Sequence, residues 1–431
     1  MTTFTTEERE ASFQKTTLDN GLRIVTSEMH YTRAVSICVY IGVGSRYETD
    51  EQAGVSHYIE HMVFKGTERR PEPQMISGEI EGTGGVINAG TEHELTVIWC
   101  KVALPHFESS LDLMLDVVRN SVFEPDAIEN ERMVVIEELN MINDYPNYKV
   151  DALIDEMLWP DHPLGRDIAG SRETVSAITQ DMLLEHVRSY YTPTNTVISV
   201  AGNINHDHVV SLIEGMCEGW RSTEKKAWAP FEGDQSAAKS RLEYRRTEQT
   251  HLSIAVPGVS LVDPDRYVLD LISTMLGEGM SSRLFVEVRE KRGLAYDVHS
   301  GVAHFMDTGA FVVSAGVDPK RVYDAIQTIL DQVGSFRQGV PEEELEKAKN
   351  LSTGRMLLRL EDSRAVASWM GNQELLLGKI AHPDDVVSRV REVTTKDIER
   401  MANAVLLTDR LNMAVVGPCR GHRRLERMLQ L

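Results

Sequence analysis

Residues 54–67 read GVSHYIEHMVFKGT, and this stretch predicts a helix with one buried face. Its apolar residues recur three or four positions apart, at the period of an α-helix: Val55, Ile59, Met62 and Val63. His57 and His61 then stand one helical turn apart and point the same way. Glu60 projects from nearly the same face of this predicted helix.

Two imidazoles placed one turn apart can bind a single zinc ion. The spacing of His57, Glu60 and His61 is HxxEH, the inverzincin arrangement of zinc hydrolases. Glu60 need not bind the metal, because it lies where it can take a proton from a metal-activated water. The alternative is a solvent-exposed helix face that carries two histidines and a glutamate without binding a metal. A catalytic zinc site therefore requires a third protein ligand from elsewhere in the chain.

The segment AIENERMVVIEELNMI, residues 127–142, offers carboxylates for that third position. Glu131 and Glu138 are seven residues apart, so on a helix they share a face to within about 20°. Glu137 lies about 100° away from Glu138. Most acidic side chains are surface groups, and spacing alone leaves Glu137 and Glu138 both open as ligands.

The stretch HYIEHMVFKGT resembles, nearly residue for residue, the HFLEHMxFKGT signature of the pitrilysin/insulinase family of inverzincins. The likeness is greatest to its mitochondrial processing peptidase branch and bacterial relatives. In that family the last glutamate of a distant ExxxVxxEE or ExxxVxxRE pattern completes the zinc site. The resemblance implies one Zn²⁺ per chain, bound by His57, His61 and Glu138, with Glu60 as the general base. It also implies that Glu131 is an auxiliary acid that supports the site.

Residues 81–99, EGTGGVINAGTEHELTVIW, predict a glycine-rich turn and a hairpin. They resemble the family's NAxTxxExT edge strand. The resemblance implies that Asn88 and Ala89 lie beside the metal and pair with the substrate backbone, as added strands do in many peptide complexes.

The second half of the chain contains no HxxEH. Its segment 277–301, GEGMSSRLFVEVREKRGLAYDVHSG, by itself predicts a helix end capped by Gly293 and a buried tyrosine. It resembles the family's GxGMSSRLFxxxREKRGLAYxVxS. The resemblance implies that Arg289 and Tyr296 reach the active site. Arginine can bind a substrate carbonyl or carboxylate, and a tyrosine hydroxyl can stabilise the oxyanion.

The chain of 431 residues is long for one domain. A polar, Pro- and Gly-containing stretch predicts a linker at 221–240, between a zinc-binding catalytic domain at 1–220 and a metal-free, substrate-contacting domain at 241–431. Pro125 and Pro341 occupy similar contexts at an offset of 341 − 125 = 216, which indicates a duplication. We expect an α+β fold of two homologous α/β-sandwich halves that form a clamshell.

Lysine and arginine total 45 against 66 aspartate and glutamate, a formal charge of −21. This charge disfavours nucleic acid and anionic membranes as partners. No apolar stretch is long enough to span a membrane, and the N-terminus has no signal-peptide pattern. Four cysteines without CxxC spacing indicate buried free thiols in a reducing compartment, and a cytoplasmic location is the expectation.

Together these features predict a zinc-dependent endopeptidase that hydrolyses peptides or unfolded polypeptide segments. One alternative is a catalytically silent scaffold or partner subunit of the same family, although this chain keeps every expected ligand and the base. Another is a metal hydrolase of a non-peptide substrate, against which Arg289 and Tyr296 argue by resemblance. Four halves complete the family's clamshell, so we expect a homodimer or a heterodimer with an inactive relative.

Overall fold

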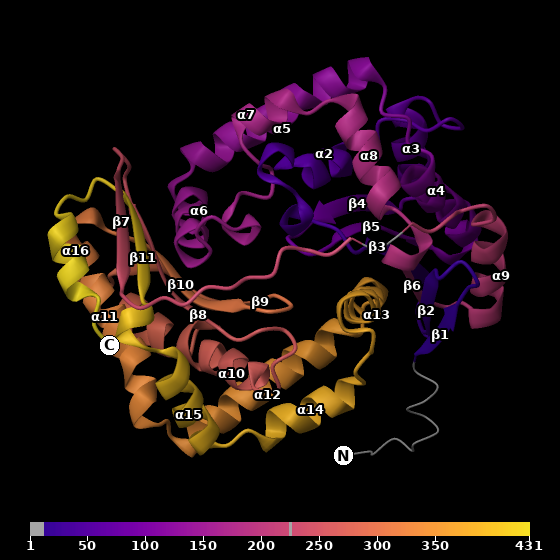
Figure 1. The fold of residues 1–431 in the computed structure, drawn as a ribbon. Helices are drawn as coiled ribbons and strands as arrows, with labels where there is room; N and C mark the ends of the chain where they lie inside the picture. Colours follow the sequence, from indigo (N-terminus) through magenta and orange to yellow (C-terminus); the bar gives the residue numbers. More distant parts are fainter. Residues whose placement is uncertain (1–12, 224–225) are drawn as a thin grey trace. The chain divides into compact units, whose positions relative to one another are not determined.

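The computed structural model describes residues 13–223 and 226–431, and Figure 1 shows its ribbon. The polar N-terminal segment 1–12 and residues 224–225 of the predicted linker lie outside the described residues. The chain forms two compact units. The first contains residues through Leu139 together with Asp167–Ala229 and Leu358–His382, and the second contains Asn140–Arg166, Pro230–Leu357 and Pro383–Leu431.

The first unit is built on a mixed six-stranded sheet. Its strands are β1 (Gln14–Thr17), β2 (Arg23–Glu28), β3 (Ala34–Ile41), β4 (Val86–Thr91), β5 (Thr96–Ala103) and β6 (Thr196–Gly202). Their order in the sheet is β1-β2-β6-β3-β5-β4, and only β2 and β6 run parallel to each other. The strand β4 is therefore an edge of this sheet.

The second unit repeats the same sheet with one strand fewer. Its strands are β7 (Lys239–Tyr244), β8 (Thr250–Pro257), β9 (Ala295–His304), β10 (Gly309–Val317) and β11 (Asn412–Gly417). Their order is β7-β11-β8-β10-β9, again with one parallel pair, β7 and β11. This order matches β2-β6-β3-β5-β4 strand for strand. The predicted duplication and α+β class are confirmed.

The offset between the halves agrees with the one in the sequence, since β3 and β8 start 250 − 34 = 216 residues apart. The last residues of β6 and β11, Gly202 and Gly417, have φ angles of 151° and 157°. A Cβ at Gly202 would lie 2.5 Å from the Ala34 oxygen, and one at Gly417 would lie 2.7 Å from the Thr250 hydroxyl. Glycine is therefore required at the same corner of both sheets.

Helices cover the sheet of the first unit: α2 (Val55–Met62), α3 (Pro73–Glu81), α4 (Phe107–Arg119), α7 (Arg172–Ala177), α8 (Gln180–Tyr190), α9 (His206–Met216) and α13 (Ser363–Leu377). The long helix α5 (Pro125–Asp144) begins in this unit and ends in the second. Buried apolar side chains of the sheet, α2, α4, α5 and α8 form one continuous core.

The second unit contains α6 (Pro146–Leu158), α10 (Arg266–Gly277), α11 (Val322–Ser335), α12 (Glu342–Arg359), α14 (Pro383–Glu392), α15 (Thr395–Val405) and α16 (His422–Met428). No helix in the described ranges is both long enough and apolar enough to cross a membrane. All four cysteines are buried free thiols, as predicted, and burial raises the pKa of Cys38 to about 12.

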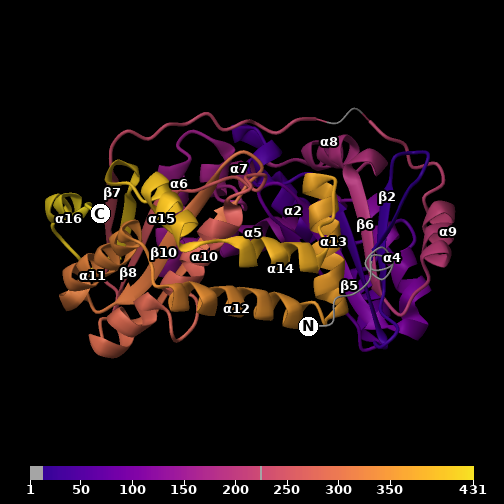
Figure 2. The ribbon, with the colours of Figure 1, turned by 90° about the horizontal axis from the view of Figure 1, so that it is seen from below.

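Two helices are exchanged between the halves of the chain. The helix α6 comes from the first half but packs on β8 and β11 of the second sheet (Figure 1). The helix α13 comes from the second half but packs on β2, β3 and β6 of the first sheet (Figure 2). They start 363 − 146 = 217 residues apart, so they are duplicated copies of one another. The compact units are thus not contiguous in sequence, and the contiguous domains at 1–220 and 241–431 stay a prediction.

Candidate metal centre

The helix α2 is fixed at its N-terminus by a buried carboxylate. Glu48 accepts hydrogen bonds from the backbone N–H groups of Gly54 at 2.8 Å and Ser56 at 2.7 Å. A negative charge at this end of a helix satisfies free N–H groups and complements the helix dipole. Gly54 has a φ of 97°, and a Cβ there would lie 2.5 Å from the Ala169 oxygen. The buried side chains of α2 are Val55, Ser56, Tyr58, Ile59 and Met62.

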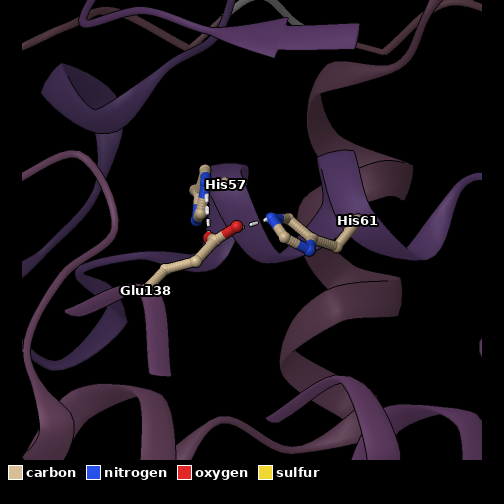
Figure 3. A group of neighbouring side chains, drawn as sticks. All are labelled: His57, His61 and Glu138. Atoms are coloured by element: carbon tan, nitrogen blue, oxygen red, sulfur yellow. Dashed lines mark ion pairs between the residues drawn. The ribbon is translucent and has the colours of Figure 1, made fainter. Parts of the chain in front are cut away.

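The opposite side of α2 presents His57 and His61 toward Glu138 of α5 (Figure 3). Glu138 Oε2 lies 3.7 Å from His57 Nε2 and 3.3 Å from His61 Nε2. A tetrahedral zinc ion with bonds of about 2.1 Å separates its ligand atoms by about 3.4 Å. Within the described residues, this is the one group of three histidine, cysteine or acidic side chains whose ligand atoms all lie within 4.8 Å of one another.

The structure separates the two glutamates that sequence spacing left open. Glu138 is half-buried and joins both histidines, whereas Glu137 is exposed. Glu138 is thus the carboxylate of α5 that completes the group, in agreement with the ligand set implied by the family resemblance.

The histidines have the properties of metal ligands. The His57 Nδ1 atom is buried and has no hydrogen-bond partner among the residues that the structure describes. Burial and the nearby charge of His61 lower the pKa of His57 to about 4, so its imidazole is neutral at pH 7. Neutral imidazole is the form that binds zinc. Two imidazoles and a carboxylate at these distances therefore fit a zinc ion.

The second histidine is oriented by a buried glutamate. His61 Nδ1 lies 2.8 Å from Glu131 Oε1, and the other carboxylate oxygen lies 2.6 Å from Lys65 Nζ. Although burial opposes ionisation, the hydrogen bonds from His61 and Lys65 lower the pKa of Glu131. A Glu131 carboxylate holds the proton of His61 on Nδ1 and leaves Nε2 free to face Glu138. Glu131 thus occupies the supporting position expected from the resemblance.

We expect Glu131→Gln and Glu131→Leu to weaken zinc binding in graded fashion. Outer-shell partners of this kind typically contribute about 10–100-fold to metal affinity. Glutamine keeps an acceptor for His61 but removes the charge, so its loss should be the smaller of the two. Competition with a chromophoric chelator measures the zinc Kd. Equal zinc affinity in both variants and the wild type would show that Glu131 does not orient His61.

Glu60 lies on α2 beside both histidines and is half-buried. In the part of the chain that the structure describes, its carboxylate makes no hydrogen bond or ion pair. Its charge contributes to raising the pKa of His61, after the opposing effect of burial and the larger effects of Glu131 and Glu138. A carboxylate that is not committed to a partner remains able to accept a proton.

Asn88 and Ala89 lie on the edge strand β4, which among the described strands pairs with β5 alone. The helix α2 packs against β4, and the Thr91 hydroxyl donates to the Ser56 carbonyl at 3.4 Å. Asn88 is exposed, and its Oδ1 accepts from the Ala89 N–H at 2.8 Å. A free strand edge beside the histidine helix is the arrangement that peptide addition requires. That these two residues bind substrate stays a prediction.

Arg289 and Tyr296 lie in the second unit. Arg289 belongs to the π-helical segment η6 (Phe285–Lys291), which is followed by Gly293 at a φ of 55°. The Arg289 guanidinium lies over the rings of Phe285 at 4.7 Å and Tyr296 at 4.9 Å. Tyr296 is 75% exposed, so the alternative of a buried tyrosine is wrong. The two residues lie together, and their substrate role stays a prediction.

Sequence reasoning missed two residues that position the site. Lys65 stands four residues after His61, a spacing that could have placed it on the same side of the chain as the ligands. Glu48 caps α2 from outside the motif, and nothing in its sequence context marks it.

Two histidines and a glutamate at HxxEH spacing on one helix are the signature of inverzincin-type zinc proteins. Comparison with known proteins defines the family. The family model described as insulinase (peptidase family M16) matches residues 23–172, and the one described as the peptidase M16 inactive domain matches residues 177–352. The chain belongs to the insulinase family, peptidase family M16.

Relatives match over nearly the whole chain. An uncharacterised zinc protease of Mycobacterium leprae is 37% identical, covering 98% of this chain and 96% of that protein. One from Bacillus subtilis is 34% identical, covering 93% and 97%. Among solved structures, a protease from Helicobacter pylori has a TM-score of 0.88 at 24% identity, covering 94% of this chain and 99% of that one. A chain of complex III from Candida albicans has a TM-score of 0.84 at 19% identity, covering 97% and 100%. These two structural likenesses show the fold alone.

Proposed function

We propose that the protein is a zinc-dependent endopeptidase that hydrolyses peptides or unfolded polypeptide segments. The observation that carries this proposal is the convergence of His57, His61 and Glu138, with Glu60 on the same helix as the two histidines. Relatives named zinc proteases support the same activity class.

Each residue of the site has a part in the proposed hydrolysis. His57, His61 and Glu138 would hold one zinc ion, which supplies Lewis acidity that acidifies water and polarises a carbonyl group. Glu60 takes a proton from the attacking water and delivers it to the departing amine nitrogen. Glu131 keeps His61 in the tautomer that faces Glu138. Tyr296 donates a hydrogen bond to the oxyanion, and Arg289 binds a substrate carbonyl or carboxylate.

The substrate is an extended chain in this proposal. The free edge of β4 at Asn88 and Ala89 pairs with its backbone, and pairing of this kind requires a segment that is not already in secondary structure. We further propose that the protein works in the cytoplasm, without nucleic-acid or membrane partners. A homodimer, or a heterodimer with an inactive relative, would supply the four halves that we expect.

The proposal is tested by metal content and cleavage measured together. Purified protein should contain about one zinc per chain and cleave a quenched fluorescent peptide. Removing the metal with a chelator should abolish cleavage, and adding zinc back should restore it. Metal-replete protein that binds no zinc, or zinc-loaded protein that cleaves no peptide in a diverse set, would favour the catalytically silent subunit instead.

A further inference from the structure

Two segments of the second unit carry a charge opposite to that of the whole chain. Residues 239–246 and 420–427 together contain eight lysines and arginines against two glutamates, a formal charge of 8 − 2 = +6. Because the whole chain has a formal charge of −21, all its other residues sum to −21 − 6 = −27. A basic surface on an acidic protein attracts anionic ligands.

The two segments lie side by side in the folded chain. The edge strand β7 belongs to the first and α16 to the second, and these two elements pack together (Figure 1). His422 Nε2 of α16 lies 3.0 Å from Ser240 Oγ and 3.1 Å from the Ser240 carbonyl oxygen of β7. We call the five arginines on this surface the arginine cluster: Arg246, Arg420, Arg423, Arg424 and Arg427.

The arginine cluster is not used to neutralise carboxylates of the fold. All five side chains are exposed, and none of them makes an ion pair with a carboxylate in the described ranges. Their neighbours Arg241 and Arg245, in contrast, are paired with Glu156 and Glu243. The cluster therefore leaves five guanidinium groups for a ligand.

Two members of the cluster are positioned by aromatic rings. The Arg424 guanidinium lies 3.7 Å from the centre of the Tyr323 ring, and that of Arg420 lies 5.0 Å from the centre of the Tyr244 ring. A cation–π contact uses the face of the guanidinium, so its N–H groups, which lie in the plane, remain able to bind carboxylates. Side chains held in this way lose less conformational freedom when a ligand binds.

The strand beside the cluster is a free edge of its sheet. Among the strands that the structure describes, β7 pairs with β11 alone, whereas its counterpart β2 in the first unit also pairs with β1. The position that β1 occupies on the first sheet is thus open on the second. An extended peptide can add to such an edge through backbone hydrogen bonds.

Backbone groups point to the open edge at every second residue of β7. The Arg245 N–H donates to the Gly417 carbonyl at 3.0 Å, so Arg245 and the residues at even spacing from it face β11. Leu242 and Tyr244 therefore direct their backbone groups toward the open edge. The Ser240 carbonyl, near the start of the strand, is already bound by α16. The part of the edge that can take a new strand therefore lies at the end of β7 that leads to Arg246.

We propose that β7 and the arginine cluster together bind an acidic, extended segment of a partner protein, which pairs with the open edge as an added strand. The cluster supplies the complementary charge, and the edge supplies the backbone hydrogen bonds. A long polyanion such as RNA is disfavoured because the rest of the chain repels it, whereas a short acidic segment meets the cluster alone. None of these residues belongs to the metal centre, so the inference is independent of the proposed peptidase activity.

The test measures the binding of a fluorescein-labelled peptide of about six residues, the length of a typical strand, in which threonine and glutamate alternate. Fluorescence anisotropy with the full-length protein gives the Kd. We expect saturable binding that weakens strongly between about 0.1 M and about 1 M salt, because the screening length falls from about 10 Å to about 3 Å. The same peptide with lysine in place of glutamate should not bind. Equal binding of both peptides would overturn the proposal.

The double variant Arg423→Gln/Arg427→Gln should raise the Kd of the acidic peptide by about tenfold, the effect of losing two exposed pairs between arginine and carboxylate. The matched control is Arg389→Gln/Arg391→Gln, which removes the same charge from exposed positions of α14 in the same unit. It should bind the peptide as the wild type does. An unchanged Kd in the first variant, or an equal loss in the control, would show that the arginine cluster is not the site.

A peptide that is N-methylated at every residue tests the added strand, because methylation removes the N–H donors and keeps every charge. We expect it not to bind, and undiminished binding would overturn the pairing with β7. A single-stranded oligonucleotide of equal charge that binds more tightly than the acidic peptide would assign the surface to nucleic acid instead.

Cleavage measured on the same variants separates this inference from the proposed function. Arg423→Gln/Arg427→Gln should contain zinc and cleave a quenched peptide as the wild type does, and a large loss of cleavage would place the cluster in substrate binding and overturn the proposal. If the wild type cleaves no peptide, the proposed function fails, and the anisotropy comparison still decides the arginine cluster.

Discussion

Glu60→Gln is expected to keep its zinc and lose peptide cleavage, with kcat lower by about three orders of magnitude. General acid–base catalysis contributes about 10²–10⁴-fold, and Glu60 serves as both acceptor and donor of the same proton in the proposed mechanism. Glutamine has the same shape but cannot take up a proton. Since Glu60 makes no ion pair or hydrogen bond within the described residues, its replacement leaves no partner stranded. The histidines and Glu138 remain in place to hold the metal.

The measurement combines zinc per chain, by atomic absorption, with the rate of cleavage of a fluorescent peptide. A co-purified peptidase would be unaffected by the substitution, so the variant also tests the source of the activity. Glu68→Gln, which removes an exposed carboxylate seven residues after His61, controls for the loss of charge. Full activity in Glu60→Gln would exclude Glu60 as the base, and loss of zinc would assign it a structural role.

The histidine helix was predictable because its signal is local. The spacing of Val55, Ile59 and Met62 gives the buried face of α2, and the same spacing aligns His57 with His61. The duplication was also predictable, because Pro125 and Pro341 recur at a fixed offset, each at the start of a long helix. Helical spacing, and the prolines that mark where a helix starts, are patterns that depend only on residues near one another in the sequence.

The choice of the third ligand and the placement of the exchanged helices depend on contacts between segments that are far apart in the sequence. Glu137 and Glu138 have nearly the same sequence context, and the choice between them depends on the rotation of α5 against α2. The helices α6 and α13 each have an apolar face, but an apolar face does not specify which of two similar sheets it covers. Because the sheets are duplicated, periodicity alone cannot assign either helix to its sheet.

The residues that support the site, Lys65 and Glu48, were missed for the same reason, because their contacts are not evident from sequence spacing. Lys65 could have been inferred from its position one turn after His61, but its partner Glu131 is on another helix. Glu48 acts on the backbone of α2 and not on any side chain of the motif. Capping by a residue seven positions before the first residue of the helix leaves no pattern that spacing rules detect. The geometry of a site therefore depends on residues that its motif does not contain.

Glu138→Ala is expected to remove zinc from the protein and abolish cleavage, while the fold persists. Outer-shell partners of a metal contribute about 10–100-fold to its affinity, so the loss of a direct ligand should weaken binding by more than about 100-fold. The Glu138 side chain is 37% exposed and lies outside the apolar core, so truncation creates no buried cavity. Chelator competition gives the zinc Kd, and circular dichroism reports the fold.

Glu137→Ala is the matched control, because it removes the neighbouring glutamate from the same helix about 100° away. It should bind zinc and cleave peptide as the wild type does. The pair of variants thus tests directly the choice that sequence spacing left open. Zinc loss in Glu137→Ala with retention in Glu138→Ala would reverse the assignment and require a different rotation of α5 in the metal-bound protein. Retention in both would mean that the third ligand comes from another element.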